Sequence, residues 1–197
     1  MAVPEILRSL HGRALGLDSN SRLIAGGNFN RGVSSLVVYT NEAASTAITN
    51  TVTQTRFDTY YSIPANSLRP GQLIKVRYQG IATSTNSTDT LAVTLYLGGT
   101  SGTALLTHAA TDVANNNVFS GEYELIVRTV GASGTIVGCG TKKNVAAAEG
   151  TATYADDILA STTIDTTAAQ ELAAYATWSV ASASNSVRMD FFRVEIA

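Results

Sequence analysis

The sequence predicts an all-β fold: a single jelly-roll-like β-sandwich with an N-terminal extended arm. Three observations predict it, namely a composition poor in charge, hydrophobic residues that alternate with period two, and closely spaced turn signals. Charged residues make up 14% of the 197 residues, against roughly 25% in an average soluble domain. Thr, Ser, Ala, Asn and Gly replace them, and small hydroxyl and β-branched side chains suit pleated, half-buried surfaces. Hydrophobic residues, at 45%, suffice for one sizeable core.

The period-two pattern begins near residue 36 and recurs to the C-terminus. In 73–81, for example, Ile74, Val76 and Tyr78 fall on one face, and 91–97 and 123–127 repeat the alternation. The last run is apolar on both sides, so both of its faces are predicted to be partly covered: Val187, Met189 and Phe191 on one, and Phe192, Val194 and Ile196 on the other.

Turn signals separate these runs into about eight to ten strands with mostly short connections. They include Arg69-Pro70-Gly71 and the segments 98–102, 115–117 and 131–134. Many strands with almost no helix between them indicate a β-sandwich or barrel, and a jelly roll fits the count. The longest irregular segment, 142–160, is predicted to be a surface loop.

Two alternative structures fit the sequence less well. The Ala-rich segment 167–176 permits a helix by local propensity, but Leu172, Ala174 and Ala176 continue a period-two face, which favours a strand. A solenoid or propeller is disfavoured because no internal repeat of fixed period is present.

The N-terminal arm, residues 1–35, differs from the domain predicted over 36–197. Residues 4–11 are compatible with a short helix. A segment this short cannot bury its own leucines, so it is expected to dock either on the main domain or on a partner, and the sequence leaves both open. The residues expected to anchor it are Ile6, Leu7, Leu10, Leu15, Leu17, Leu23 and Ile24.

Charge and hydropathy exclude two classes of partner. With a net charge of −2 and no dense basic run, the chain offers little to a phosphate backbone, so nucleic acid is not an expected partner. No apolar stretch reaches membrane-spanning length, and the N-terminus lacks the apolar core of a secretory signal. A soluble protein made in the cytoplasm, with no membrane partner, is expected.

No motif for chemistry emerges from the residues that usually supply it. Cys139 is predicted to be a small buried hydrophobe, and His11 and His108 to be solvated surface histidines without metal-ligand spacing. Asp156 and Asp157 are predicted to lie in a solvated turn. The sequence therefore predicts no catalytic residue, no metal and no cofactor, hence no enzyme; a sugar-active enzyme whose carboxyl groups converge across a cleft stays open as a lesser alternative.

Aromatic side chains have two interpretations. Packing in the core or on the sheet is the default, and a platform for stacking sugars is the alternative. The residues concerned are Tyr60, Tyr61, Tyr78, Tyr96, Tyr123, Tyr154, Tyr175 and Trp178.

One segment resembles a family. Residues 62–77, SIPANSLRPGQLIKVR, are similar to a segment of structural proteins of tailed bacteriophages. The resemblance continues through 80–99, includes the closing RMDFFRV at 188–194, and extends to the leader LGLDSNSRLI at 15–24. It covers residues 60–197 and that leader.

Within that group the chain resembles capsid cement or decoration proteins. The resemblance implies a jelly-roll trimer on the capsid exterior of the virion, with the major capsid protein and its own copies as partners. Such a protein stabilises the shell by multivalent non-covalent docking, without chemistry. A tail-fibre or spike module that binds a host-surface glycan is the alternative, because fibre proteins share similar modules.

Overall fold

The computed structural model describes residues 15–17, 23–25, 36–85, 88–146 and 154–197. The chain divides into two compact units, Met1–Ser34 and Ser35–Ala197. The described elements of the first unit are β1 (Leu15–Leu17) and β2 (Leu23–Ala25), which pair antiparallel. This part of the arm, predicted to be extended, is therefore a two-stranded hairpin.

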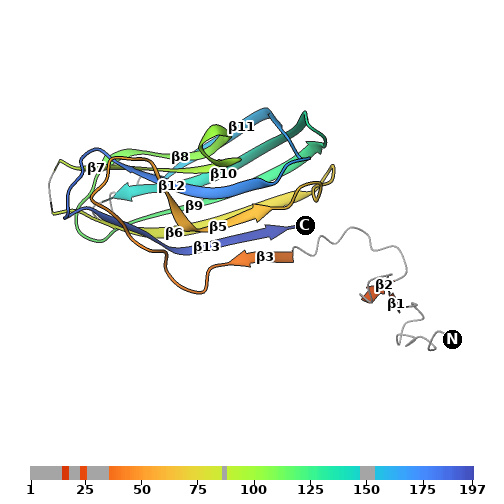
Figure 1. Cartoon of the computed structure of the whole chain (residues 1–197), viewed down its shortest axis with the longest axis horizontal. Helices are drawn as coiled ribbons and strands as arrows, with labels where there is room; N and C mark the ends of the chain where they lie inside the picture. Colours follow the sequence, from red (N-terminus) through yellow and green to blue (C-terminus); the bar gives the residue numbers. More distant parts are fainter. Residues whose placement is uncertain (1–14, 18–22, 26–35, 86–87, 147–153) are drawn as a thin grey trace. The chain divides into compact units, whose positions relative to one another are not determined.

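The second unit consists of two antiparallel sheets packed face to face (Figure 1). In the large sheet the order is β11-β10-β9-β6-β13-β3, and β4 also pairs with β13; in the small sheet it is β5-β12-β7-β8. The large-sheet strands are β3 (Leu36–Thr40), β4 (Ile48–Thr49), β6 (Leu73–Thr83), β9 (Asn117–Thr129), β10 (Gly134–Ala146), β11 (Tyr154–Ile164) and β13 (Ser186–Ile196). The small-sheet strands are β5 (Thr55–Ile63), β7 (Thr90–Leu97), β8 (Thr103–Asp112) and β12 (Gln170–Trp178).

The strand order confirms the predicted jelly roll. The order β9-β6-β13-β3 in the large sheet and β5-β12-β7-β8 in the small one is that of a jelly roll, and the chain passes between the sheets as two Greek keys require. The β10–β11 hairpin extends the large sheet beyond β9. In the part of the chain that the structure describes, the one helical element is a 3₁₀ turn, Gly99–Ser101.

Local predictions for two segments had different outcomes. Strand was the right choice for 167–176, where β12 forms. The surface loop predicted over 142–160 is wrong at both ends, because β10 continues to Ala146 and β11 begins at Tyr154. Two of its charged side chains lie on the paired strands: Lys142 Nζ is 3.3 Å from Asp157 Oδ2 across the hairpin.

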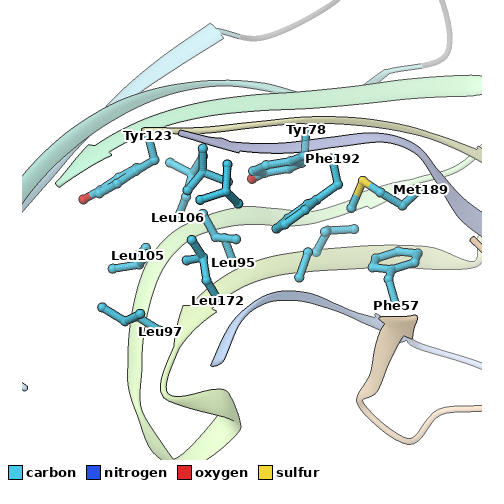
Figure 2. Packing of buried hydrophobic residues seen from close by; sticks show 14 of the residues in the cluster. Phe57, Tyr78, Leu95, Leu97, Leu105, Leu106, Tyr123, Leu172, Met189 and Phe192 are labelled. Atoms are coloured by element: carbon cyan, nitrogen blue, oxygen red, sulfur yellow. The ribbon is translucent and has the colours of Figure 1, made fainter. Parts of the chain in front are cut away.

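The core lies between the sheets and follows the predicted alternation. Its largest fully buried side chains come from both layers: Trp178, Tyr78, Tyr123, Phe57, Phe119 and Phe192. Figure 2 shows Tyr78, Tyr123 and Phe192 from the large sheet over Leu95 and Leu172 from the small one. The inward faces predicted for 73–81, 91–97 and 123–127 are all buried, which confirms them.

A β-bulge in β13 corrects the prediction for the last strand. The pairing of β13 with β6 shifts register between Met189 and Phe191. The extra residue reverses the alternation, so that Val187 and Met189 before it, and Phe192 and Val194 after it, are all fully buried. Apart from Phe191, which is not part of the core, the two sets therefore share one face instead of opposing one another.

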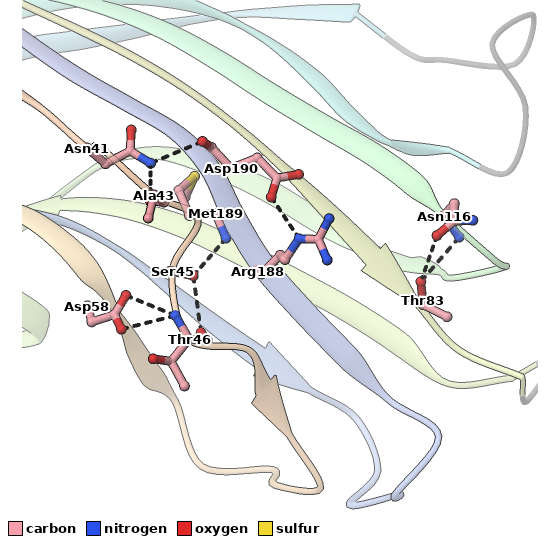
Figure 3. Close-up of polar contacts among 10 residues, drawn as sticks. All are labelled: Asn41, Ala43, Ser45, Thr46, Asp58, Thr83, Asn116, Arg188, Met189 and Asp190. Carbon is pink, nitrogen blue, oxygen red and sulfur yellow. Dashed lines mark hydrogen bonds and ion pairs between the residues drawn. The ribbon is translucent and has the colours of Figure 1, made fainter.

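The segment between β3 and β4 satisfies the backbone of this bulge (Figure 3). Asn41 donates from Nδ2 to the carbonyl of Asp190 at 3.0 Å and accepts from the amide of Phe192 at 2.7 Å. The Ser45 amide donates to the Met189 carbonyl at 2.8 Å, and Ser45 Oγ accepts from the Met189 amide at 2.9 Å.

Replacing Asn41 with alanine is expected to lower the free energy of unfolding by about 1–3 kcal/mol, because it leaves part-buried backbone groups unsatisfied. Urea denaturation measures the change. The matched control is Glu42→Ala at the exposed neighbouring position, which is expected to change stability by less than about 0.5 kcal/mol. Equal losses in the two variants would show that the bulge does not depend on the amide.

Candidate functional sites

The hairpin of the first unit brings together four of the seven predicted anchors. Leu17 pairs with Leu23, Gly16 with Ile24, and Leu15 with Ala25. The other three anchors, Ile6, Leu7 and Leu10, lie outside the described residues, as do His11 and the helix predicted over 4–11. A two-stranded hairpin alone is marginally stable in water, so this element requires another surface.

The prediction that His108 is a surface residue is wrong, because the side chain is buried. It lies in β8 with 0% exposure, and its Nε2 is 2.8 Å from the hydroxyl of Tyr78 on β6. Burial, followed by the charge of Lys142, lowers the pKa of His108 to about 4. Burial also raises the pKa of Tyr78 above its ordinary value. The imidazole is therefore neutral at pH 7 and shares a hydrogen bond with the tyrosine hydroxyl, which makes the pair a polar element of the core.

The prediction that Cys139 is buried is also wrong, since the residue is exposed on the outer face of the large sheet. Its register partners are Glu124 on β9 and Ile158 on β11. The alternation of residues along this strand did not show which of its two faces lies inward. The glycines on either side of Cys139 take the inward positions, and an added Cβ at Gly140 would overlap the ring of Tyr123.

Charged residues form ion pairs on that same outer face. Between β6 and β9, Lys75 pairs with Glu124 at 2.8 Å and Arg77 with Glu122 at 2.6 Å; along β13, Arg193 pairs with Glu195 at 2.7 Å. Surface pairs of this kind typically contribute less than about 1 kcal/mol each. Asp156 and Asp157 lie in β11 and not in the predicted turn.

The outer face of the small sheet carries a second group, which we call the tyrosine network: Gln54, Arg56, Tyr60, Tyr96, Glu171 and Tyr175. Arg56 forms an ion pair with Glu171 and lies 3.9 Å from the ring centroid of Tyr60. Tyr175 donates to Glu171 Oε1 at 2.6 Å, and its ring meets Tyr96 edge-on at 5.5 Å. Gln54 Nε2 donates to the Tyr96 hydroxyl at 3.2 Å.

Beside this network lies a cavity of about 330 Å³, which we call the threonine groove. It is lined by Thr46, Ala47, Ile48, Thr49, Thr51, Thr55, Arg56 and Asp58. Asp58 accepts from the Thr46 amide at 3.0 and 3.2 Å (Figure 3), and hydrogen bonds from the Thr46 side chain and amide lower the pKa of its carboxyl group. The groove therefore has a charged carboxylate, a guanidinium and several hydroxyl groups in fixed positions.

Aromatic residues thus divide between the two interpretations of the sequence. Tyr78, Tyr123 and Trp178 are core residues, as the default predicted, whereas Tyr60, Tyr96 and Tyr175 are half-buried on an outer face. The polar members of the network were missed. The signal that pointed to them is the outward alternation Arg56, Asp58, Tyr60 on β5.

Among the described residues, no group of three or more His, Cys, Asp and Glu side chains is placed to hold a metal ion. No helix in the described part of the chain is long and apolar enough to span a membrane.

No family model matches the sequence, and no curated protein matches it. Among solved structures, a chain in the structure of infectious bursal disease virus, Gt strain, is 13% identical with a TM-score of 0.34. That match covers 92% of this chain and 36% of the viral chain, so this chain spans about a third of its length. The lectin UEA-II, complexed with galactose, is 7% identical with a TM-score of 0.36, and the match covers 93% of this chain and 90% of the lectin.

Proposed function

We propose that this chain is a non-enzymatic virion structural protein that decorates and stabilises a phage capsid from its exterior. It docks as a homotrimer on the major capsid protein, through the N-terminal segment. The observation that carries the proposal is that the leucine-rich β1–β2 hairpin belongs to a compact unit of its own. The resemblance of residues 15–24 and 62–77 to phage structural proteins adds the location.

The physical reasoning starts from the hairpin. Two short strands cannot shield apolar residues from water, so the hairpin gains stability when a second surface covers it. In a trimer three such segments dock at once, and each raises the effective concentration of the others. A protein that binds the assembled shell and not its separated subunits stabilises the shell by mass action.

The test is a full-length variant in which Leu15, Leu17 and Leu23 are all replaced by serine. We expect the β-sandwich to keep its unfolding temperature, because these positions belong to the first compact unit and the sandwich to the second. Co-sedimentation with assembled phage shells is expected to be lost. The matched control is Val180→Ser, which removes an apolar side chain that is 45% exposed in the second unit; it should co-sediment as the wild type does.

Two results would contradict the proposal. One is decoration by the triple-serine variant at wild-type occupancy, which would remove the docking role of the hairpin. The other is a monomeric mass in solution and on the shell, which would remove the trimer.

A further inference from the structure

We propose that the outer face of the small sheet is a binding site for a neutral oligosaccharide. One sugar ring occupies the threonine groove, and the next stacks on the tyrosine network. This activity goes beyond the proposed capsid role and depends on neither the N-terminal hairpin nor a trimer. Arg56 belongs to both features, since it lines the groove and pairs with Glu171 in the network.

The stacking surface arises from the strand register. Ala173 on β12 pairs with Tyr60 on β5 and with Tyr96 on β7, so one small residue lies between two tyrosines. Ala173 is 0% exposed, although it alternates with the inward-facing Leu172 and Ala174. Tyr60 and Tyr96 themselves are half-buried and so keep part of their surface exposed. A tyrosine that is partly exposed offers an apolar ring face for the C–H groups of a sugar and a hydroxyl for hydrogen bonds.

The polar groups of the network are held in place before any ligand arrives. Glu171 is fixed from two sides, by Arg56 and by the hydroxyl of Tyr175 at 2.6 Å. Gln54 donates to Tyr96, which leaves the amide oxygen of Gln54 as an acceptor and the hydroxyl of Tyr96 as a donor. Side chains that are already ordered lose little entropy on binding.

The threonine groove suits a hydroxylated ligand. Its volume of about 330 Å³ is at the lower end of the range for small-molecule sites, roughly 300–1,000 Å³. Apart from Ala47 and Ile48, every lining residue carries a hydroxyl, a carboxylate or a guanidinium. An apolar peptide would leave these groups without partners, at a cost in free energy, whereas sugar hydroxyls both donate to and accept from them.

The charge of the site favours a neutral sugar over an anionic one. Within the two features the guanidinium of Arg56 is neutralised by Glu171, so the remaining charge is the carboxylate of Asp58. Hydrogen bonds from the Thr46 side chain and amide lower the pKa of that carboxyl group, so it is ionised at pH 7. A carboxylated or sulfated sugar would meet a like charge in the groove.

The experiment screens the full-length protein against immobilised di- to tetrasaccharides, with neutral hexose and N-acetylhexosamine members and with sialylated and sulfated members. The best neutral probe is then titrated by calorimetry. Tyr96→Ala removes a stacking ring, and Glu171→Gln keeps the shape while removing the charge that holds Arg56. Each is expected to weaken binding at least tenfold. Arg77→Ala, on the outer face of the other sheet, is the matched control and should bind as the wild type does.

Binding to neutral probes with these losses supports the proposal. It is overturned by the absence of any neutral hit, by hits confined to anionic probes, or by variants that keep their unfolding temperature and their affinity. Shell co-sedimentation by Glu171→Gln is expected to equal that of the wild type, so failure of this site and failure of the capsid role are distinguishable.

Discussion

Replacing Gly80 with alanine is expected to destabilise the β-sandwich by about 3 kcal/mol, near the upper end of overpacking effects. Gly80 lies in β6 at the centre of the large sheet, where an added Cβ would overlap both the ring of Phe119 and the backbone carbonyl of Arg188. A side chain can move aside, but the Arg188 carbonyl belongs to the neighbouring strand β13, next to its bulge. The backbone must therefore shift.

Chemical denaturation of wild type and variant measures this effect, with Gln79→Ala at the exposed adjacent position as the control. A second variant separates the two overlaps. Phe119→Leu in the Gly80→Ala background relieves the ring but not the carbonyl, so it is expected to leave most of the loss in place. Full recovery in that double variant would mean that the ring, and not the backbone, causes the strain.

Acidification from about pH 7.5 to about pH 5 is expected to lower the free energy of unfolding by about 2 kcal/mol through His108. Burial, followed by the charge of Lys142, lowers the pKa of the folded-state imidazole to about 4, whereas in the unfolded chain it is about 6.5. Between these values the unfolded state binds more protons, so stability falls as the pH falls. The contribution of His108 is complete above the pKa of the unfolded chain, and it is lost as the pH falls towards the pKa of the folded protein.

Urea denaturation at a series of pH values checks this expectation. The variant His108→Leu combined with Tyr78→Phe removes both partners of the buried hydrogen bond, which avoids leaving one unsatisfied. Its stability is expected to vary much less over this pH range. His11→Gln is the control for the other histidine of the chain, and should keep the wild-type slope. An unchanged slope in the double variant would assign the acid sensitivity to other groups.

Much of the fold was predictable because a sheet with one buried face imposes a period of two on its sequence. The faces of 73–81, 91–97 and 123–127 were right for that reason. The pattern failed where geometry interrupts it. The bulge at Met189 reverses the alternation of β13 without any Gly or Pro to mark it. Residues 142–160 lack a clear alternation and were therefore predicted as a loop, although both ends of the segment are strands.

Less of the functional surface could be predicted. Alternation shows which residues share a face, but it does not show which face lies inward when both carry small or mixed residues. Cys139, between two glycines, was therefore placed on the wrong side. His108 lies within β8, and nothing local reveals that Tyr78, thirty residues away, supplies its partner. The tyrosine network joins three strands that only the tertiary fold places side by side.

The β10–β11 hairpin widens the large sheet and places β11 at its edge. This edge affects whether copies of the protein can pair strand to strand at high concentration. A sheet that ends on an unpaired strand is a template for adding another chain, and β11 is such a strand. It also carries Ile158, which is 81% exposed. The ion pair between Lys142 and Asp157 sets two charges at that border, and a strand added there would have to strip water from both. We therefore expect the charged hairpin to oppose the addition of a further strand at this edge of the sheet.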